Sequence, residues 1–308
     1  MADDFEQTVA PYRAELHAHC YRMLGSLHDA DDALQDALLR AWRGIDRFQG
    51  RSSLRSWLYR IATNVSLDLI ARRPKRVLPL DYDEREGPLW LEPYPAELED
   101  ASPAPDARYE QRESVELAFV AAVQHLPPNQ RAALMLRDVL GFRAREAAET
   151  LDTTVESVNS ALARARRTLE RRLPERSQQQ TLRALGDDGV RQVVERYMDA
   201  MERADVEAIV GLLSEDAVWS MPPLPESYRG EEAIRAFLHA GPLNQRWRHL
   251  PTHANGQAAV GCYILHKDRY RAAVIDVLTL DGPRISAITA FIDPRLFKPF
   301  GLPESYAA

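Results

Sequence analysis

The 308-residue sequence has little cysteine and no long apolar run. Its two cysteines, Cys20 and Cys262, are too few for a disulfide framework or a four-cysteine zinc site, so both are expected to be small core residues. No stretch approaches the roughly 18 apolar residues that can span a bilayer. The first residues, Met1-Ala2-Asp3-Asp4, are acidic, whereas a signal segment is basic and then apolar. These absences argue against a disulfide-rich secreted domain and a membrane protein, and they predict a cytoplasmic location.

The composition is that of an ordinary globular protein, but its charge is unevenly distributed. Hydrophobic residues make up 45% and charged residues 28%, and the length predicts two or three domains. The net charge of -7 disfavours a nucleic-acid partner on average. Residues 40–76, however, hold ten basic residues against two acids, a stretch that could bind phosphate. Residues 81–113 hold eleven acids against three arginines, with five prolines that interrupt any helix, which predicts an acidic, extended linker.

A second change of composition, rich in serine, glutamine and glycine, predicts another linker before a new amphipathic helix. We therefore divide the chain into three domains with two linkers and a tail. The segments are residues 1–76, a linker at 77–113, residues 114–173, a linker at 174–188, residues 189–300 and a tail at 301–308.

The first domain is predicted to be helical. Apolar residues recur at helical spacing from Ala33 to Ile45, with Trp42 in the buried stripe and Asp29 as the N-cap. A different face of this helix carries acidic and amide groups and one leucine at spacings of three and four residues. A partner could bind this patch; a solvated helix face is the alternative. The patch consists of Asp32, Gln35, Asp36 and Leu39.

The next helix is predicted to start after the sequence Phe48-Gln49-Gly50-Arg51-Ser52 and to end at Pro74. Gly50 allows a turn and Ser52 can cap the helix. Arg60 and Asn64 lie off the buried stripe, so basic, amide and aromatic groups meet at one end. This combination is typical of surfaces that bind single-stranded nucleic acid. Ordinary packing of Phe48 at the start of the helix is an equally good interpretation of the pattern.

Residues 114–173 predict a helix-turn-helix. A helix from Ala144 to Leu151 is followed by the turn Asp152-Thr153-Thr154 and a helix from Val155 to Leu173, with Thr153 and Glu156 as a capping box. Small, polar and basic side chains lie on the outer face of the second helix, as a recognition helix requires in the major groove. A plain three-helix packing unit is the alternative. The outward residues are Asn159, Ser160, Ala163, Arg164 and Arg167.

Several motifs in this order resemble the bacterial sigma-70 family over residues 5–173, and more narrowly an extracytoplasmic-function sigma factor with two sigma domains. They are Cys20-Tyr21-Arg22-Met23-Leu24-Gly25-Ser26, the 32–42 helix, Phe48-Gln49-Gly50-Arg51, Trp57-Leu58-Tyr59-Arg60-Ile61-Ala62-Thr63-Asn64 and Leu126-Pro127-Pro128. The resemblance implies a protein that binds core RNA polymerase and directs it to promoter DNA. An anti-sigma partner is not identifiable from the sequence.

The resemblance also implies roles for individual residues. The patch of Asp32, Gln35, Asp36 and Leu39 would bind the largest polymerase subunit. Phe48, Gln49, Gly50 and Arg51 would capture a flipped base of the minus-ten element, with Arg60 and Asn64 near the same element. Asn159, Ser160, Ala163, Arg164 and Arg167 would meet the minus-thirty-five element. The acidic linker would thread the polymerase channel; a solvated tether is an equal alternative.

The third domain is predicted to be α+β. Two helices, a strand, a helix and four further strands, near residues 246–253, 258–266, 270–280 and 284–292, resemble the cone-shaped SnoaL-like fold over residues 189–295. The predicted fold class is thus two all-α domains, the second a helix-turn-helix, followed by an α+β domain whose curved sheet encloses a pocket.

Asp276 is the sharpest candidate for chemistry in this pocket. It shares a strand face with Val274 and Leu278, and a carboxyl group in apolar surroundings has a raised pKa. A paired or surface-facing Asp276 in a packed core is the blander interpretation. No complete acid and base pair can be assigned, so we predict small-molecule binding rather than catalysis, with no cofactor. The further residues proposed to line the pocket are Trp219, Met221, His249 and Phe291.

Two other functions stay open at this point. The chain could be a SnoaL-like isomerase, cyclase or hydrolase fused to a DNA-binding module, or a simple repressor that binds duplex DNA without polymerase. A metal site is not predicted, because His17, His19 and Cys20 point in different directions around one helix.

Overall fold

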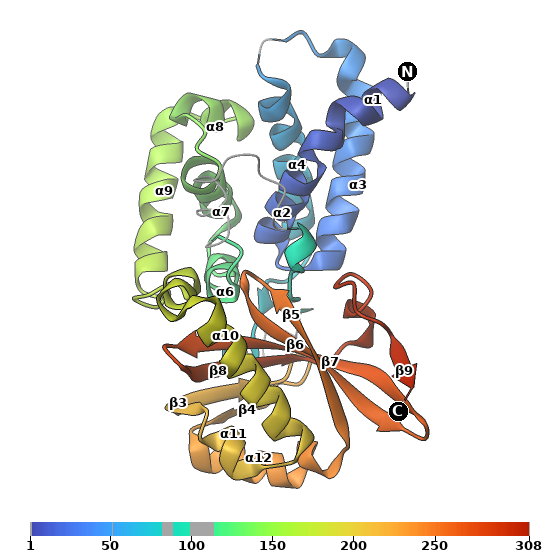
Figure 1. Ribbon diagram of the computed structural model, residues 1–308. Helices are drawn as coiled ribbons and strands as arrows, with labels where there is room; N and C mark the ends of the chain where they lie inside the picture. The colour runs from blue at the N-terminus through green and yellow to red at the C-terminus, as the bar shows by residue number, and fades with distance from the viewer. Residues whose placement is uncertain (1, 51, 82–88, 99–113, 308) are drawn as a thin grey trace. The chain divides into compact units, whose positions relative to one another are not determined.

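The computed structural model describes residues 2–50, 52–81, 89–98 and 114–307 (Figure 1). The chain divides into two compact units. Unit 1 comprises residues 1–76, 85–94 and 98–174, and unit 2 comprises residues 77–84, 95–97 and 175–308. We describe each unit by itself.

Unit 1 is mainly helical in its described residues. Two groups of helices correspond to the two helical domains predicted from the sequence. The first group is α1 (Ala2–Val9), α2 (Arg13–Leu24), α3 (Leu27–Gly44) and α4 (Leu54–Ile70). The second is α6 (Leu117–Gln124), α7 (Pro128–Leu134) with a π-helical turn at Met135–Val139, α8 (Ala144–Thr150) and α9 (Val155–Glu170).

The cap of α3 differs from the predicted one. Ser26 is the N-cap, and its Oγ accepts a hydrogen bond of 3.1 Å from the backbone N–H of Asp29. Asp29 is not the N-cap because its carboxylate is used elsewhere. It accepts hydrogen bonds from Arg73 and from Arg76, whose Nη2 lies 2.6 Å from Oδ2. The start of α3 is thereby tied to the segment that follows α4.

The caps of α4 and α9 each lie one residue beyond the prediction. Ser53, not Ser52, has the extended backbone of an N-cap and accepts from a first-turn N–H at 3.0 Å. Thr154, not Thr153, does the same for α9 at 3.2 Å. Adjacent serines and threonines have nearly equal capping propensity, so the backbone path decides between them.

The described part of the predicted acidic linker is packed rather than extended in solvent. It contains two-residue strands, β1 (Arg76–Val77) and β2 (Leu89–Trp90), and short 3₁₀ turns at Pro79–Asp81 and Ala96–Leu98. Leu91 and Tyr94 are 1% and 0% exposed. The Tyr94 ring stacks on Tyr21 with centroids 4.4 Å apart, and its hydroxyl lies 2.8 Å from His17 Nδ1. Residues 82–88 and 99–113 of this linker lie outside the described residues.

The prediction of a second linker at 174–188 is wrong, because most of this segment is helical. Most of it belongs to α10 (Gln178–Glu202), which is broken only at Gly186, where φ is +72°. The Gln178 amide donates to the carbonyl oxygen of Leu280 at 2.9 Å and accepts from the Leu280 N–H at 2.8 Å. These paired bonds dock the first part of α10 on the sheet of unit 2, a contact over 102 residues that composition cannot reveal.

Unit 2 is an α+β domain built on one curved sheet with the strand order β4-β3-β8-β7-β6-β5 (Figure 1). The four strands from β5 to β8 form an antiparallel meander, as predicted, and β3 pairs with β8 in parallel. The strands are β3 (Leu213–Ser220), β4 (Ser227–Arg229), β5 (Trp247–Ala254), β6 (Gln257–His266), β7 (Arg269–Asp281), β8 (Arg284–Phe291) and β9 (Ser305–Ala307). The helices are α10, α11 (Val206–Val210) and α12 (Glu231–Ala240).

The core of unit 2 lies between one face of this sheet and α10, α11 and α12. Tyr197 of α10, Trp219 of β3 and Leu278 of β7 are among its fully buried members. The predicted tail at 301–308 contains a strand, β9, which pairs with the start of β7. The predicted fold class, helical domains followed by an α+β domain, is confirmed.

Candidate functional site

The outer face of α3 carries an apolar patch beside acidic groups. Asp32 and Gln35 are exposed, and Asp36 forms a 2.9 Å ion pair with Arg40. Leu39 is 47% exposed. The patch therefore presents an unburied leucine with carboxylates beside it, as the spacing predicts.

Trp42 extends this patch, although the periodicity assigns it to the buried stripe. It is 51% exposed and lies three residues from Leu39, so the two side chains share a helix face. The neighbouring Ala41 is fully buried, so the buried part of the stripe ends before Trp42. Two large apolar side chains exposed side by side are typical of a protein-binding surface.

The loop between α3 and α4 presents a half-buried aromatic ring. Phe48 packs on Trp57 with ring centroids 5.1 Å apart and an interplanar angle of 36°. Gln49 and Gly50 are exposed, and Gly50 has a φ of +66°, which requires the freedom of glycine. Phe48 thus has one face supported by the protein while part of the ring stays accessible. Arg51, assigned to the same loop, lies outside the described residues.

On α4, the two residues assigned to DNA lie on one accessible face. Arg60 and Asn64 are exposed and are separated by one helical turn. Arg55, in contrast, is bound within the protein. Its Nη2 lies 3.0 Å from Glu15 Oε2, and its guanidinium lies 4.8 Å from the ring centroid of Tyr59. Arg55 therefore supports the packing of α4 on α2.

The second helix of the helix-turn-helix has the two faces that the sequence predicts. Its inner face is buried in unit 1, and its outer face is accessible. The buried residues are Val158, Ala161, Leu162, Ala165 and Leu169. The exposed residues are Asn159, Ser160, Ala163, Arg164 and Arg167. A neighbouring arginine, Arg166, is paired with Asp138 at 2.7 Å and serves the packing instead.

In unit 2, Asp276 lies inside the core and is paired. Its Oδ2 accepts a 2.8 Å hydrogen bond from the Tyr197 hydroxyl and lies 3.1 Å from the Cys262 sulfur. Burial raises the pKa of Asp276 to about 6, against the two hydrogen bonds, which lower it. Burial also raises the pKa of the Tyr197 hydroxyl. The buried carboxyl group therefore takes up a proton at a higher pH than an exposed aspartate does.

His249 faces the same interior. It lies opposite Cys262 in the β5–β6 register. Its Nδ1 lies 3.4 Å from Glu202 Oε1, and its Nε2 is buried without a hydrogen-bond partner among the described residues. Burial lowers the pKa of His249 to about 4, so the ring is neutral. Trp219 and the half-buried Met221 belong to the same core cluster.

Phe291 does not share this interior, contrary to the prediction. In the β7–β8 register, Asp276 is opposite Ala290, whereas Phe291 is opposite Ile275. Opposed residues in an antiparallel pair point to the same face, and adjacent residues point to opposite faces. Phe291 therefore packs on the other side of the sheet, and its neighbour Ala290 is the residue that shares the face of Asp276.

The histidines of α2 have structural partners. His17 Nε2 lies 3.1 Å from Asp31, and His19 Nε2 lies 2.9 Å from the Thr63 hydroxyl. Within the described ranges, no three His, Cys, Asp or Glu side chains are grouped as a metal site. Within the same ranges, no helix combines the length and apolar character needed to cross a membrane.

Three family models match the chain in the order of these parts. The Sigma-70 region 2 model matches residues 8–76, the Sigma-70 region 4 model matches residues 116–169, and the SnoaL-like domain model matches residues 194–288. The chain is 42% identical to the ECF RNA polymerase sigma factor SigG of Mycobacterium tuberculosis, over 98% of this chain and 85% of that protein. The chain belongs to the extracytoplasmic-function sigma factors. It is an RNA polymerase sigma factor with a C-terminal SnoaL-like domain.

A second relative matches most of the length of the sigma factor. The chain is 28% identical to the sigma factor SigJ of Mycobacterium tuberculosis, over 90% of this chain and 85% of that protein. The crystal structure of SigJ matches with a TM-score of 0.63 and 22% identity, covering 98% of this chain and 100% of that one. This likeness shows that the sigma factor and SigJ have the same fold.

The SnoaL-like domain of the sigma factor offers a stability test of the Asp276 environment. Because the folded pKa, about 6, exceeds the ordinary 3.8, Asp276 contributes stability that is complete below pH 4 and is lost as pH rises through 6. At 1.36 kcal/mol per pKa unit, the loss is about 3 kcal/mol. We expect the amide hydrogen-exchange protection of β6 and β7 in Asp276→Asn, relative to the wild type, to increase as pH rises from 4 to 7.5. The increase in this ratio should reach up to about 100-fold.

The comparison with the variant is essential in this measurement because His249 acts in the opposite direction. Its lowered pKa contributes stability that is lost as pH falls. The difference between wild type and Asp276→Asn, corrected for intrinsic exchange rates, isolates the carboxyl group. A difference that does not change with pH would show that folding does not raise the pKa of Asp276.

Proposed function

We propose that three surfaces of unit 1 have separate roles in transcription initiation. The α3 patch, with Leu39 and Trp42, binds core RNA polymerase. The Phe48 loop and the outer face of α4 hold the minus-ten element, and the outer face of α9 reads the minus-thirty-five element. The observation that carries this proposal is that the described residues assigned to the two DNA surfaces are all exposed, apart from Phe48, whose ring is half-buried.

The Phe48 loop supplies a physical route to strand opening. Extracting a base from a duplex costs a few kcal/mol, and stacking on an aromatic face returns roughly 1–3 kcal/mol. Phe48 is supported from behind by Trp57, so its ring is fixed before a base arrives. Gln49 and Gly50 then provide an exposed amide and exposed backbone beside it. Only an unpaired base can use this surface, so binding favours the melted state.

The outer face of α9 supplies sequence-specific contacts. Arginine reads guanine through paired hydrogen bonds worth about 1–3 kcal/mol each. We expect Arg164→Ala to weaken binding to the selected upstream element by about 10-fold and to relax the base preference at one position, as measured by selection from randomised upstream sequences. The matched control is Arg145→Ala on α8, an exposed arginine that pairs only locally with Glu149. Equal losses for both variants would indicate general phosphate attraction without base reading.

Promoter binding requires unit 1 to open. Elements centred near positions -10 and -35 are roughly 25 base pairs apart, which is about 85 Å at 3.4 Å per pair. A compact unit of roughly 160 residues has a diameter of about 40 Å. Helices α4 and α9 cannot reach both elements while their domains stay packed in one unit. We propose that polymerase binding stabilises a separated arrangement of the two helical domains.

The decisive experiment is in vitro transcription from a genomic DNA library with purified core polymerase. Specific transcripts that depend on the added protein, with a common upstream sequence, are expected. Binding to duplex DNA without transcripts, and without co-purification of the polymerase, would instead indicate a repressor. Since the polymerase acts in the cytoplasm, we propose that the sigma factor acts there too.

We propose that the SnoaL-like domain regulates the sigma factor without catalysing a reaction. The carboxyl group of Asp276 is engaged by Tyr197 and Cys262, which leaves no assigned partner base. A chain that ends at Arg176 is expected to give a changed transcription output; unchanged output and polymerase affinity would discard the regulatory role. Turnover of a polyketide, steroid or epoxide that is lost in Asp276→Asn would establish the alternative, a SnoaL-like enzyme.

A further inference from the structure

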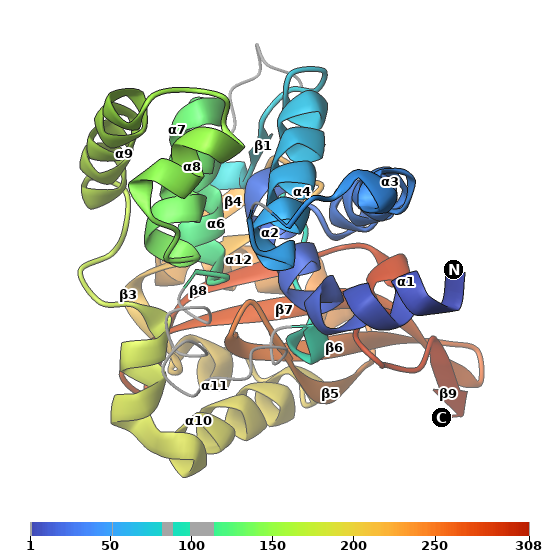
Figure 2. The same ribbon diagram turned by 90° about the horizontal axis from the view of Figure 1, so that it is seen from above.

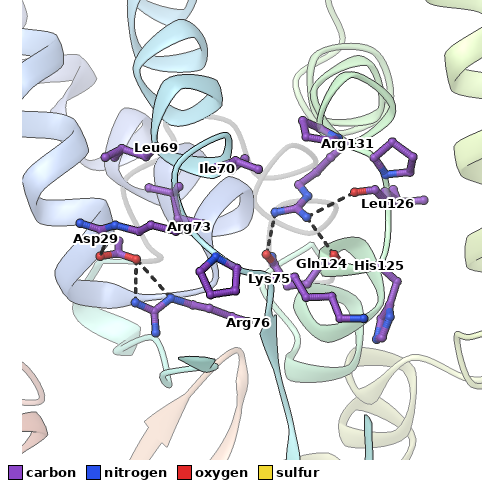
Figure 3. A pocket seen from close by; sticks show the side chains of 14 residues that line it. Asp29, Leu69, Ile70, Arg73, Lys75, Arg76, Gln124, His125, Leu126 and Arg131 are labelled. Atoms are coloured by element: carbon purple, nitrogen blue, oxygen red, sulfur yellow. Dashed lines mark hydrogen bonds and ion pairs between the residues drawn. The ribbon is translucent and has the colours of Figure 1, made fainter. Parts of the chain in front are cut away.

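Unit 1 contains a cavity of about 340 Å³ where the end of α4 meets the start of α7 (Figure 3). Its volume falls in the range of small-molecule sites. One wall comes from the first helical domain and the other from the helix-turn-helix domain. The lining residues are Leu24, Asp29, Leu69, Ile70, Arg73, Pro74, Lys75, Arg76, Gln124, His125, Leu126, Pro127, Pro128 and Arg131.

The cavity wall carries an excess of positive charge. Among the described lining residues, four are cationic, Arg73, Lys75, Arg76 and Arg131, and one is a carboxylate, Asp29. Outside this lining, Glu92 lies 3.7 Å from Arg76 Nη1. The Asp29 carboxylate is bound on its side of the cavity by Arg73 and Arg76, as Figure 3 shows. It therefore does not neutralise the opposite wall, which Arg131 forms.

Arg131 is a buried cation whose described partners are all uncharged. It is 3% exposed, and burial lowers the pKa of its guanidinium to about 10. Four of its five N–H groups donate to oxygens: two Nη1 groups to Met23 O and Gln124 Oε1, and two Nη2 groups to Gln124 O and Leu126 O. The fifth, Nε–H, is buried and has no partner among the described residues.

A charge buried in this way is costly unless an opposite charge approaches it. The remaining Nε–H and the local positive potential both favour an anion in the cavity. A phosphate group suits the wall well because its several oxygens accept hydrogen bonds from more than one cationic side chain. The apolar residues Leu24, Leu69 and Ile70 line the same cavity and can contact the carbon part of a phosphorylated molecule.

We propose that this cavity binds a phosphorylated small molecule, with its phosphate beside Arg131 and Lys75. The ligand contacts both helical domains, so it binds only the closed unit. This inference rests on the proposed function, in which polymerase binding separates the two helical domains. A ligand that binds the closed unit therefore opposes polymerase capture. The cavity is thus an inhibitory site through which a phosphorylated metabolite holds the sigma factor closed.

The binding experiment is calorimetric titration of the full-length protein with inorganic pyrophosphate, in magnesium-free buffer at constant ionic strength, with chloride as the reference anion. Saturable binding is expected, weakened at least 10-fold by Lys75→Gln and by Arg131→Gln. Lys75→Gln keeps the test valid if Arg131→Gln fails to fold. The matched control is Arg72→Gln, an exposed cation three residues from Lys75 that does not line the cavity. No saturable binding, or the same affinity in all variants, overturns the site.

The functional arm measures capture of core polymerase by the labelled protein, without nucleotides. Pyrophosphate at 100 times its dissociation constant is expected to raise the apparent dissociation constant for polymerase by up to about 100-fold, and Lys75→Gln should abolish this sensitivity. Unchanged capture by the wild type overturns the inhibitory site and leaves the proposed function intact. Failure to capture polymerase without any pyrophosphate would refute the proposed function instead, while the calorimetric result still decides whether the cavity binds an anion.

Discussion

Replacing Leu39 by arginine is expected to weaken capture of core RNA polymerase by about 30-fold or more. Leu39 and Trp42 are 47% and 51% exposed on one face of α3, next to the Asp36 carboxylate. Central apolar residues of an interface commonly contribute 2 kcal/mol or more on truncation. Arginine adds the cost of burying a charge against an apolar partner surface. Promoter binding should decrease only in proportion to the fraction of sigma factor that is no longer bound to polymerase.

The measurement is an equilibrium titration of core polymerase with the labelled sigma factor. Leu224→Arg is the matched control, because Leu224 is a leucine of similar exposure, 43%, in the SnoaL-like domain. The control should leave polymerase affinity within about two-fold of wild type, since exposed substitutions outside an interface usually change little. Equal affinities for wild type and Leu39→Arg would remove the α3 patch from the polymerase interface.

The features that the sequence predicted well depend on local periodicity. The apolar residues of α3 and α9 repeat at helical spacing, and the exposed faces follow from the same repeat. The antiparallel meander of β5 to β8 follows from alternation and from the turn at Gly282. Trp42 shows the limit of this reasoning. An apolar stripe predicts which face of a helix is buried. The length over which that face is buried depends on the neighbouring elements.

The features that the sequence missed depend on contacts between distant residues. The linker residue Tyr94 is buried because His17 and Tyr21 lie beside it, 77 and 73 positions earlier. Nothing near Tyr94 in the sequence indicates this. Phe291 was assigned to the wrong face because adjacent residues of a strand point to opposite faces, and only the pairing of β7 with β8 shows which of them shares the face of Asp276. Asp276 is buried and paired, and its partner Tyr197 could be found only in the folded domain.

Phe48→Ala is expected to reduce formation of the open promoter complex by roughly 10- to 100-fold while polymerase capture stays near wild type. The lost base stack is worth roughly 1–3 kcal/mol. The residue lies in the loop before α4, whereas Leu39 and Trp42 lie on α3, so the two variants should separate capture from melting. Open complexes can be followed by permanganate reactivity of unpaired thymines, with capture measured in parallel.

Two controls distinguish a role in melting from a loss of structure. Phe48→Tyr keeps an aromatic ring against Trp57 and should retain most of the activity, because the stacking surface is preserved. A template that is already unpaired at the minus-ten element should restore much of the activity of Phe48→Ala, since the cost of extracting the base is then removed in advance. Equal loss on paired and unpaired templates would mean that Phe48 serves only to position the start of α4, and the proposed capture of an unpaired base by its ring would be wrong.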